Sequence, residues 1–220
     1  MRMYRFLLPL SLPAVLLGLA APAIAPARTA PGIVHVRLDT SAGPITLALD
    51  ARHAPKTVTN FLQYVDDGRF DGIQFYRAAR RKDAPTQGFI QGGIRTDARR
   101  ILPPFPLETT AQTGIRHVDG TISMARRGDP SSAGGNFFIT VGPMPSMDAH
   151  GSSVGYAAFG HVVGGMATVR RILARPTGGR MGGQIFLKPV AITRAVRLDG
   201  KAKPTGYVKP WLEKTRKEAR

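Results

Sequence analysis

The residues best suited to chemistry lie in three short motifs in the middle of the chain. They are Phe75-Tyr76-Arg77, Phe89-Ile90-Gln91-Gly92-Gly93 and Gly134-Gly135-Asn136-Phe137-Phe138. Together these motifs contain one arginine, two amides and several aromatic rings, but no convincing nucleophile. Such side chains suit a reaction that breaks no covalent bond and twists a planar group inside a partly apolar groove. Rotation about an X-Pro peptide bond is a reaction of this kind.

Signatures of other catalytic classes are missing. The chain has no cysteine, which excludes thiol catalysis and cysteine-based zinc sites. Its five histidines show no metal-ligand spacing, no Gly-x-Ser-x-Gly motif occurs, and the glycine-rich stretch 128–135 lacks the Gly-Lys-Ser/Thr ending of a phosphate loop. Met181-Gly182-Gly183-Gln184 is interpreted as a turn. We therefore expect neither a metal nor another cofactor.

Composition and apolar patterning predict one β-rich domain. The 220 residues include 25 glycines and 18 prolines, and 43% are hydrophobic, which favours many turns and short elements around a real core. Alternation predicts strands, and helical spacing of apolar residues predicts two helices, the first led by Pro55. The expected strands are 33–38, 45–49, 72–78, 89–91, 120–125, 136–141, 157–162 and 189–198, and the helices are 54–68 and 165–174. Two helices and about eight strands over one core favour a closed or nearly closed barrel.

The N-terminal residues have the three-part layout of a secretory signal peptide, with early arginines, an apolar run and small residues. We assign a signal peptide to residues 1–27 and a spacer to 28–32, with an uncleaved anchor as the alternative. The folded domain is expected over 33–198, in the periplasm or otherwise exported. Residues 199–220 form a basic tail that contains Trp211. We interpret this tail as disordered, with a docking segment for a membrane surface or partner as the alternative.

The chain is strongly basic, with 31 Lys and Arg against 14 Asp and Glu and a formal charge of +17. Arginines are spread over many loops, so we interpret the charge mainly as a solvated surface. The functional alternative is attraction to acidic polymers or anionic lipid, including weak contact of the tail with a membrane surface. An exported protein rarely meets nucleic acid, and we expect none as a partner. We also expect a monomer.

Five motifs in order resemble those of the cyclophilin-type peptidyl-prolyl isomerases. They are Phe75-Tyr76-Arg77, Gln91-Gly92-Gly93, Ser123-Met124-Ala125, Asn136-Phe137-Phe138-Ile139 and Phe159-Gly160-His161-Val162. The likeness covers about residues 33–198, including both predicted helices. It implies a mainly β fold, an eight-stranded antiparallel closed barrel capped by two α-helices. It also implies that the partners are proline-containing polypeptide segments, which here would belong to exported proteins.

The resemblance also implies roles for individual residues. Arg77 would donate to the twisted amide, and Gln91 would orient Arg77 or the substrate carbonyl; the plainer interpretations are a surface arginine and an amide that ties two strands. The apolar seat for proline would be lined by Phe89, Phe138 and Met147. The backbone at Ala125 and Arg126 would pair with the extended substrate. Asn136 would add a second polar side chain, and Tyr156 stands where the family often has a histidine.

Two departures from the family pattern leave room for other functions. The basic loop 80–85 is inserted between Arg77 and Gln91, and Gly88 replaces the usual aromatic residue before Phe89. One wall of the proline seat is therefore expected to be missing or rebuilt. The first alternative is a proline-segment binding module or chaperone with the same fold and little catalytic activity. The second is a basic adhesin or nucleic-acid binder.

Overall fold

The structure is a computed structural model that describes residues 32–212. The predicted signal peptide (1–27), most of the spacer and residues 213–220 of the tail lie outside the described residues. Within residues 32–212, no helix is long and apolar enough to cross a membrane.

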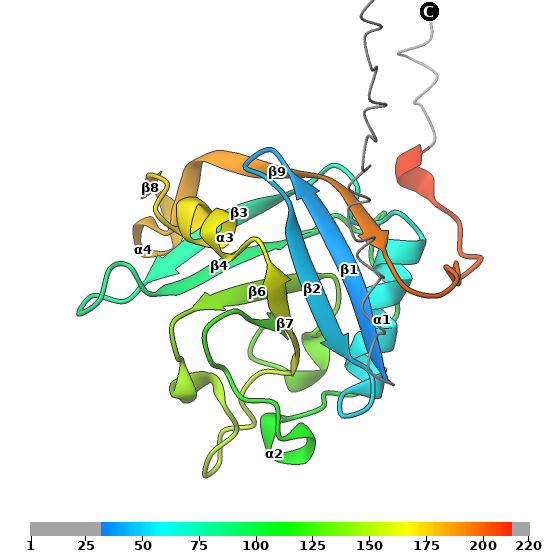
Figure 1. The fold of residues 1–220 in the computed structure, drawn as a ribbon, viewed down its shortest axis with the longest axis horizontal. Helices are drawn as coiled ribbons and strands as arrows, with labels where there is room; N and C mark the ends of the chain where they lie inside the picture. The colour runs from blue at the N-terminus through cyan, green and yellow to red at the C-terminus, as the bar shows by residue number, and fades with distance from the viewer. Residues whose placement is uncertain (1–31, 213–220) are drawn as a thin grey trace, which may run out of the picture.

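Nine antiparallel strands form one sheet in the order β1-β2-β7-β5-β6-β4-β3-β9-β8, and β1 also pairs with β9 (Figure 1). This pairing closes a barrel of eight strands, to which β8 is added outside the ring. The predicted eight-stranded antiparallel barrel and all of its predicted strands are confirmed. Their bounds are β1 Ile33–Thr40, β2 Ile45–Asp50, β3 Ile73–Arg80, β4 Gly88–Gly93, β5 Thr121–Met124, β6 Asn136–Val141, β7 Ala158–Gly164, β8 Thr177–Gly178 and β9 Ile185–Arg197.

Both predicted helices are present, α1 at Pro55–Asp66 and α3 at Met166–Leu173, and they lie on opposite sides of the barrel (Figure 1). Shorter helical turns occur in the connections. They are α2 Thr110–Thr113, α4 Arg180–Gly183, and the 3-10 turns η1 Pro130–Ser132, η2 Pro145–Met147 and η3 Pro210–Leu212.

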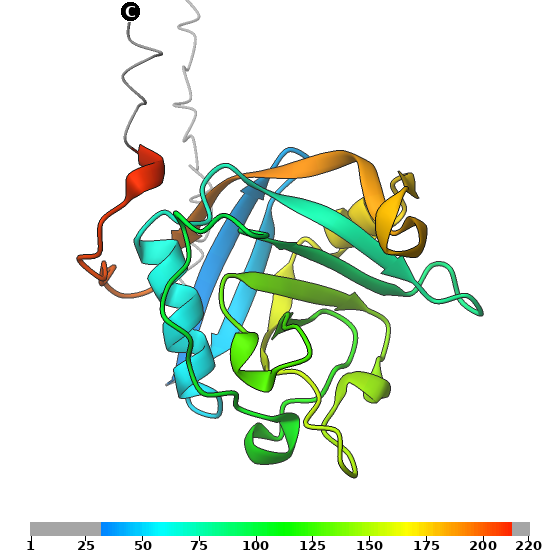
Figure 2. The same cartoon turned by 180° about the vertical axis from the view of Figure 1, so that it is seen from behind.

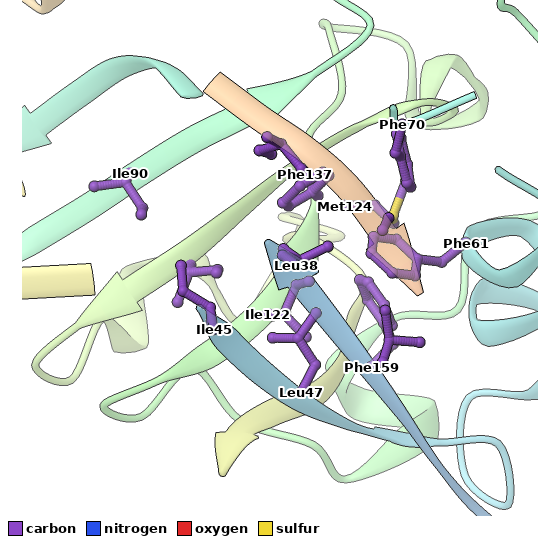
Figure 3. Close-up of a cluster of buried hydrophobic side chains, with 14 of the residues drawn as sticks. Leu38, Ile45, Leu47, Phe61, Phe70, Ile90, Ile122, Met124, Phe137 and Phe159 are labelled. Atoms are coloured by element: carbon purple, nitrogen blue, oxygen red, sulfur yellow. The ribbon is translucent and has the colours of Figure 1, made fainter. Parts of the chain in front are cut away.

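One apolar core fills the barrel and extends under α1 (Figure 3). Phe61 of α1 enters it, and its ring centroid lies 5.0 Å from Phe70, 5.4 Å from Phe137 and 5.2 Å from Phe159. All four rings are fully buried. Because burying a large apolar side chain is worth about 1.5–3 kcal/mol, this helix holds the barrel end firmly.

The loop between β4 and α2 (residues 94–109) is tied to the first turn of α1, beside which it runs in Figure 2. The helix has no side-chain cap of its own. Instead, the Glu108 carboxylate accepts from the backbone N–H groups of Lys56 (3.1 Å) and Thr57 (2.8 Å). These bonds satisfy orphan donors at the positive end of the helix and fix one end of loop 94–109.

The last strand begins at Ile185, earlier than the predicted Pro189. Pairing with β3 is irregular where this proline lies, since Phe75 pairs with Val190 and Arg77 with Ile185. A proline has no N–H to donate to a ladder and is tolerated at such irregularities. The proline therefore interrupts the pairing without ending the strand.

The structure also differs from the disordered tail that we expected, as far as it describes residues 199–212, which we call the C-terminal segment. This segment lies against the end of α1 (Figure 1). The Lys203 N–H donates to Asp66 at 2.9 Å, and the Thr205 hydroxyl donates to Asp67 at 2.6 Å. The Trp211 ring lies under the Arg69 guanidinium, 4.6 Å from its central carbon. Contacts far apart in sequence hold the segment, so local composition did not predict its placement.

Candidate active site

A groove of ≈ 670 Å³ opens on the barrel between β3, β4, β6 and loop 94–109. It contains every residue that the sequence singled out: Arg77, Phe89, Gln91, Ala125, Arg126, Asn136, Phe138, Met147 and Tyr156. Its wall is completed by Tyr76, Ile94, Arg95, Thr96, Ile101, Leu102, Pro104, Arg127, residues 131–135, Met181 and Ile185. The structure thus brings together residues spread over more than half of the folded domain.

A β-bulge in β3 decides which residues of Phe75-Tyr76-Arg77 reach the groove. Opposite β4, Phe75 pairs with Gly92 and Arg77 with Gln91, so Tyr76 is the extra residue. Strict alternation would place Phe75 and Arg77 on one face. Because a bulge turns the strand locally, Phe75 is fully buried in the core while Tyr76 and Arg77 both line the groove.

The Arg77 guanidinium is held by two neutral amides. Its Nη1 donates to Oε1 of Gln91 at 2.9 Å, while Nε and Nη2 donate to Oε1 of Gln184 at 2.9 and 2.7 Å. The group lies over the Phe89 ring, 5.0 Å from its centroid. Burial lowers the pKa of Arg77 from its usual value, but arginine remains cationic in proteins. Three of the five N–H donors of a guanidinium are used, and two remain for a ligand.

A chain of hydrogen bonds continues from Gln91 across the groove floor. The Gln91 amide N–H donates to the Tyr76 hydroxyl at 2.7 Å, and that hydroxyl donates to Oδ1 of Asn136 at 3.3 Å. Burial raises the pKa of Tyr76, so the phenol keeps its proton and can act as this donor. The Asn136 amide also bonds to the backbone N–H and carbonyl of Arg95, at 2.8 and 2.9 Å. The polar residues are thus locked in one arrangement before a ligand arrives.

Phe138 forms the apolar seat of the groove. Its ring centroid lies 5.3 Å from Phe89 and 5.5 Å from Tyr156, while Phe137 points into the core instead. This is the division that alternation predicts for adjacent strand residues. The ring also stacks on buried His117, at 5.7 Å and 12°. Met147 lines the same groove.

His117 supports the Phe138 ring from the side of the core. Its Nδ1 lies 2.6 Å from the Asp148 carboxylate, and its Nε2 lies 2.9 Å from the Ser123 hydroxyl. Burial lowers the pKa of His117, and the Asp148 carboxylate opposes this effect without overcoming it. The imidazole is therefore neutral at pH 7 and serves as a hydrogen-bonded support for Phe138.

Ala125 and Arg126 lie where β5 ends, on the rim of the groove. The Ala125 N–H is already bonded to the Asn136 carbonyl at 2.9 Å. Arg126 donates from Nε to the Gly155 carbonyl at 2.9 Å and lies over the Tyr156 ring, 4.9 Å from its centroid. Arg126 therefore braces the wall that carries Tyr156, in addition to lining the groove.

Sequence reasoning assigned no site role to Met181 and Arg95, which line the groove, or to Gln184, which lies outside the lining and holds Arg77. Gln184 holds Arg77, although Met181 and Gln184 were interpreted only as parts of a turn. Arg95 was counted among the scattered surface arginines, but its guanidinium lies over the Tyr76 ring at 5.3 Å. A signal for Gln184 was available, because it directly precedes a strand that pairs with β3 at Arg77.

Of the expectation that one wall of the proline seat is missing or rebuilt, the structure rules out rebuilding by loop 80–85 or Gly88. No residue from 78 to 88 lines the groove; they extend the β3–β4 hairpin, which projects away from the barrel (Figure 1). Gly88 has φ +140°, and a Cβ there would lie 2.0 Å from the Ala79 carbonyl oxygen. The close approach of the two strands excludes an aromatic residue at this position, so glycine is a packing requirement here.

The described residues contain no group of three or more His, Cys, Asp or Glu side chains that could hold a metal ion.

Residues 35–197 match a protein family described as cyclophilin type peptidyl-prolyl cis-trans isomerase/CLD. Among curated proteins, the chain is 39% identical over 163 residues to peptidyl-prolyl cis-trans isomerase A of Dickeya dadantii, covering 73% of this chain and 82% of that protein. It is also 39% identical over 165 residues to isomerase cyp18 of Streptomyces antibioticus, covering 73% and 96%.

Solved structures are similar in fold. A cyclophilin type peptidyl-prolyl cis-trans isomerase of Cryptosporidium parvum superposes with a TM-score of 0.60 at 21% identity, covering 77% of this chain and 99% of that one. A second structure of that protein, determined in the presence of the dipeptide Ala-Pro, gives a TM-score of 0.60 over 76% and 99%. At this identity the likeness concerns the fold alone.

Proposed function

This chain belongs to the cyclophilin-type peptidyl-prolyl cis-trans isomerase family and is an isomerase of that type, and from this premise we propose how its groove accelerates rotation about X-Pro bonds. One observation carries the proposal. Arg77, a permanent cation with two unused N–H donors, is held by neutral amides beside the apolar seat of Phe138.

The energetic demand of the reaction fits such a site. Resonance gives the peptide C–N bond a rotation barrier of about 18–20 kcal/mol, and uncatalysed exchange of X-Pro takes tens to hundreds of seconds. A useful acceleration requires the removal of roughly 5–7 kcal/mol. No bond is broken, so neither a nucleophile nor a general base is needed.

Arg77 acts on the twisted amide. As the bond rotates, conjugation is lost and the prolyl nitrogen becomes pyramidal, with a lone pair that accepts a hydrogen bond. The planar ground state offers no such acceptor, so a fixed donor stabilises the transition state more than the substrate. Gln91 keeps the guanidinium fork in place, which removes the cost of orienting it during the reaction.

The apolar seat supplies the second element. Phe138, Phe89 and Met147 would enclose the proline ring, while the polypeptide on its amino side lies along Ala125 and Arg126. Fixing the ring and leaving the preceding carbonyl free to turn restricts the motion to the bond that isomerises. Asn136 adds a polar side chain along this path.

The activity of Arg77→Ala tests the mechanism. We expect kcat/KM for an Ala-Pro peptide, measured by NMR exchange, to fall about 10²–10³-fold, as when a donor to a developing charge is removed. Arg194→Ala is the matched control, because Arg194 is an exposed arginine outside the groove. Equal rates for wild type and Arg77→Ala would refute the assignment. Retained peptide affinity in Arg77→Ala would separate lost chemistry from lost binding.

We further propose that the substrates are exported proteins, on the basis of the signal-like residues 1–27. Cell fractionation followed by N-terminal sequencing of the mature protein tests this proposal. We expect cleavage within the small residues after the apolar run and recovery outside the cytoplasm. Recovery of the protein with Met1 in the cytoplasmic fraction would refute it.

A further inference from the structure

The groove is lined by four arginines and by no acidic residue or lysine of the described chain: Arg77, Arg95, Arg126 and Arg127. None of the four forms an ion pair within residues 32–212. Other arginines do pair with carboxylates: Arg37, Arg69, Arg81, Arg99, Arg100, Arg170 and Arg197. No ion pair therefore neutralises the groove arginines, and the one carboxylate that interacts electrostatically with any of them at longer range, among the described residues with a resolved pKa shift, is that of Asp129 with Arg126.

Two of these arginines have guanidinium groups with no hydrogen-bond partner among the described residues, namely Arg95 and Arg127. Both residues are exposed at the groove, and each forms hydrogen bonds only through its backbone: Arg95 with Asn136, and the Arg127 N–H with the Ser132 hydroxyl at 2.8 Å. The Arg95 guanidinium lies over the Tyr76 ring, which leaves its N–H donors unused. By contrast, Arg77 is held by amides, and Arg126 donates to three backbone carbonyls. Arg95 and Arg127 are thus the cations free to meet a ligand.

The backbone of Arg95 is built to place its side chain there. Its φ of 56° is in the left-handed region, which costs a non-glycine residue about 1–2 kcal/mol. The Asn136 side chain holds this conformation, because its Oδ1 accepts from the Arg95 N–H at 2.8 Å and its Nδ2 donates to the Arg95 carbonyl at 2.9 Å. The guanidinium then lies over the Tyr76 ring inside the groove. Strain retained at a groove position indicates a role in ligand contact.

From these observations we infer that the isomerase selects acidic segments, in which Asp or Glu flanks the X-Pro bond and its carboxylate pairs with Arg95 or Arg127. This inference rests on the proposed function and names its substrate class. Arginine forks match carboxylates in bidentate geometry, and four unpaired cations in a partly enclosed groove attract anionic chains and repel basic ones.

The groove fits an acidic peptide better than a nucleic acid. Binding of single strands relies on aromatic faces on which bases stack. Here Tyr76, Phe89 and Tyr156 each already carry an arginine over the ring, at 5.3, 5.0 and 4.9 Å from the centroid. The remaining groove ring, Phe138, stacks on His117. An extended polypeptide needs only the apolar seat and the cations beside it.

The test uses three matched peptide series in which Glu, Gln or Lys stands at each position flanking one Ala-Pro bond. Isomerisation is measured by NMR exchange and affinity by isothermal titration calorimetry. At low salt we expect kcat/KM for the best Glu peptide to exceed that of its Lys counterpart by roughly tenfold, since each exposed pair contributes a few-fold. At about 1 M salt, where the Debye length is about 3 Å, the ratio should approach one.

The variant Arg95→Gln/Arg127→Gln tests whether these two arginines cause the preference for Glu over Lys peptides. We expect its Glu-to-Lys ratio to fall to about threefold or less, in both kcat/KM and affinity. Arg52→Gln/Arg194→Gln removes the same charge from exposed arginines outside the groove and should keep the wild-type ratio. Unfolding followed by Trp211 fluorescence verifies that both variants are folded.

Three outcomes would overturn the inference. They are equal constants for Glu, Gln and Lys peptides, an undiminished Glu preference in Arg95→Gln/Arg127→Gln, and tighter binding of a short oligothymidylate than of the best Glu peptide. Failure of the proposed function is distinguishable from these. Without turnover of any peptide, calorimetry still reports whether the groove prefers Glu, whereas equal turnover of all three series contradicts only the charge preference.

Discussion

Arginines gather in two regions of this molecule, the groove and the contact between α1 and the C-terminal segment, and the two regions treat charge differently. At the end of α1, Arg69 donates to Asp67 at 2.8 Å, Arg197 pairs with Asp66, and Lys209 lies 3.8 Å from Asp67. In the groove, Arg77 is held by amides and no carboxylate faces it. Carboxylates neutralise the cations of the first region, whereas in the second region amide and backbone carbonyl oxygens orient Arg77 and Arg126.

The two regions differ because a carboxylate and an amide affect the charge of an arginine differently. A buried carboxylate compensates the charge of the arginine and thereby stabilises the fold, because an unpaired buried charge is costly. An amide oxygen accepts hydrogen bonds but carries no net charge, so the field of the guanidinium remains available to a ligand. The first arrangement holds the C-terminal segment on the domain, and the second leaves a preorganised cation at the site of reaction.

Removal of the carboxylate at the end of α1 should have the largest effect on stability. In Asp67→Asn, buried Arg69 loses the negative charge that compensates it, and one acceptor oxygen for Arg69, Thr205 and Lys209 is lost; the side chains of Asp67 and Arg69 are 0% and 2% exposed. We expect the free energy of unfolding to fall by about 3–5 kcal/mol, with kcat/KM of the folded protein unchanged. Urea unfolding followed by Trp211 fluorescence measures the loss.

Asp39→Asn is the control, since its partner Arg37 is 45% exposed and surface pairs contribute only about 0–1 kcal/mol. Similar losses in Asp39→Asn and Asp67→Asn would contradict the stabilising role of the buried pair. A fall in kcat/KM at a temperature where Asp67→Asn is folded would show that the two regions are not independent.

Changes at Gln184, a positioning residue, should affect activity rather than stability. Gln184→Ala removes two of the three hydrogen bonds that hold Arg77. Hydrogen bonds to charged groups contribute about 1.5–3 kcal/mol, and Gln91 retains the third, so we expect kcat to fall about five- to tenfold with little change in KM or in the free energy of unfolding.

Gln184→Glu sharpens the comparison, because it places in the groove the kind of partner found at the end of α1. The carboxylate still holds the Arg77 fork but compensates its charge, so we expect kcat to fall at least as far as in Gln184→Ala while stability is kept or gained. Wild-type kcat in Gln184→Glu would mean that orientation alone matters and that the neutrality of the amide is irrelevant.

Trp211→Ala should have a smaller effect, confined to the C-terminal segment. The ring centroid lies 4.6 Å from the Arg69 guanidinium carbon and 5.4 Å from that of Arg100. Each such contact contributes about 0.5–1 kcal/mol at partly exposed sites, so we expect a loss of about 1–2 kcal/mol in thermal unfolding. Hydrogen exchange should increase in residues 203–212. Leu212→Ala, whose side chain is 65% exposed, is the control and should change neither measurement.

The free energy of unfolding should depend on pH through His117, which packs behind Phe138 of the groove. Burial lowers the pKa of His117 below its ordinary 6.5, so the unfolded chain takes up a proton that the folded protein rejects. The stability that depends on neutral His117 is therefore fully present above about pH 6.5 and is lost as the pH falls below it. Unfolding between pH 5 and 8 measures this slope. The slope should become smaller in His117→Gln, where His161, whose pKa burial also lowers, supplies the remainder, and it should persist in His53→Gln, since His53 is 54% exposed.

Much of the fold was predictable from the spacing of apolar residues within each helix and strand. Val58, Phe61, Leu62 and Val65 recur at helical spacing, and α1 buries all four. Alternation in Asn136-Phe137-Phe138 correctly placed one ring in the core and the other in the groove. Such patterns are readable because the period of each element is a property of the backbone, and the apolar face must be buried whatever the partner is.

What only the tertiary structure decided depends on contacts between distant segments. The bulge that turns both Tyr76 and Arg77 into the groove arises from the pairing of β3 with β4 and β9. Three hydrogen bonds form only after the barrel has closed. Arg77 donates to Gln184, the Arg95 N–H donates to Asn136, which holds Arg95 in its left-handed conformation, and Thr205 donates to Asp67. By itself, the sequence determined the elements, the family and the residue types at the site. The pair of Arg69 with Asp67 is local in sequence. Which arginines line the groove, and that amides rather than carboxylates hold Arg77, was decided by the fold, because Gln91 and Gln184 are its neighbours in space and not in sequence.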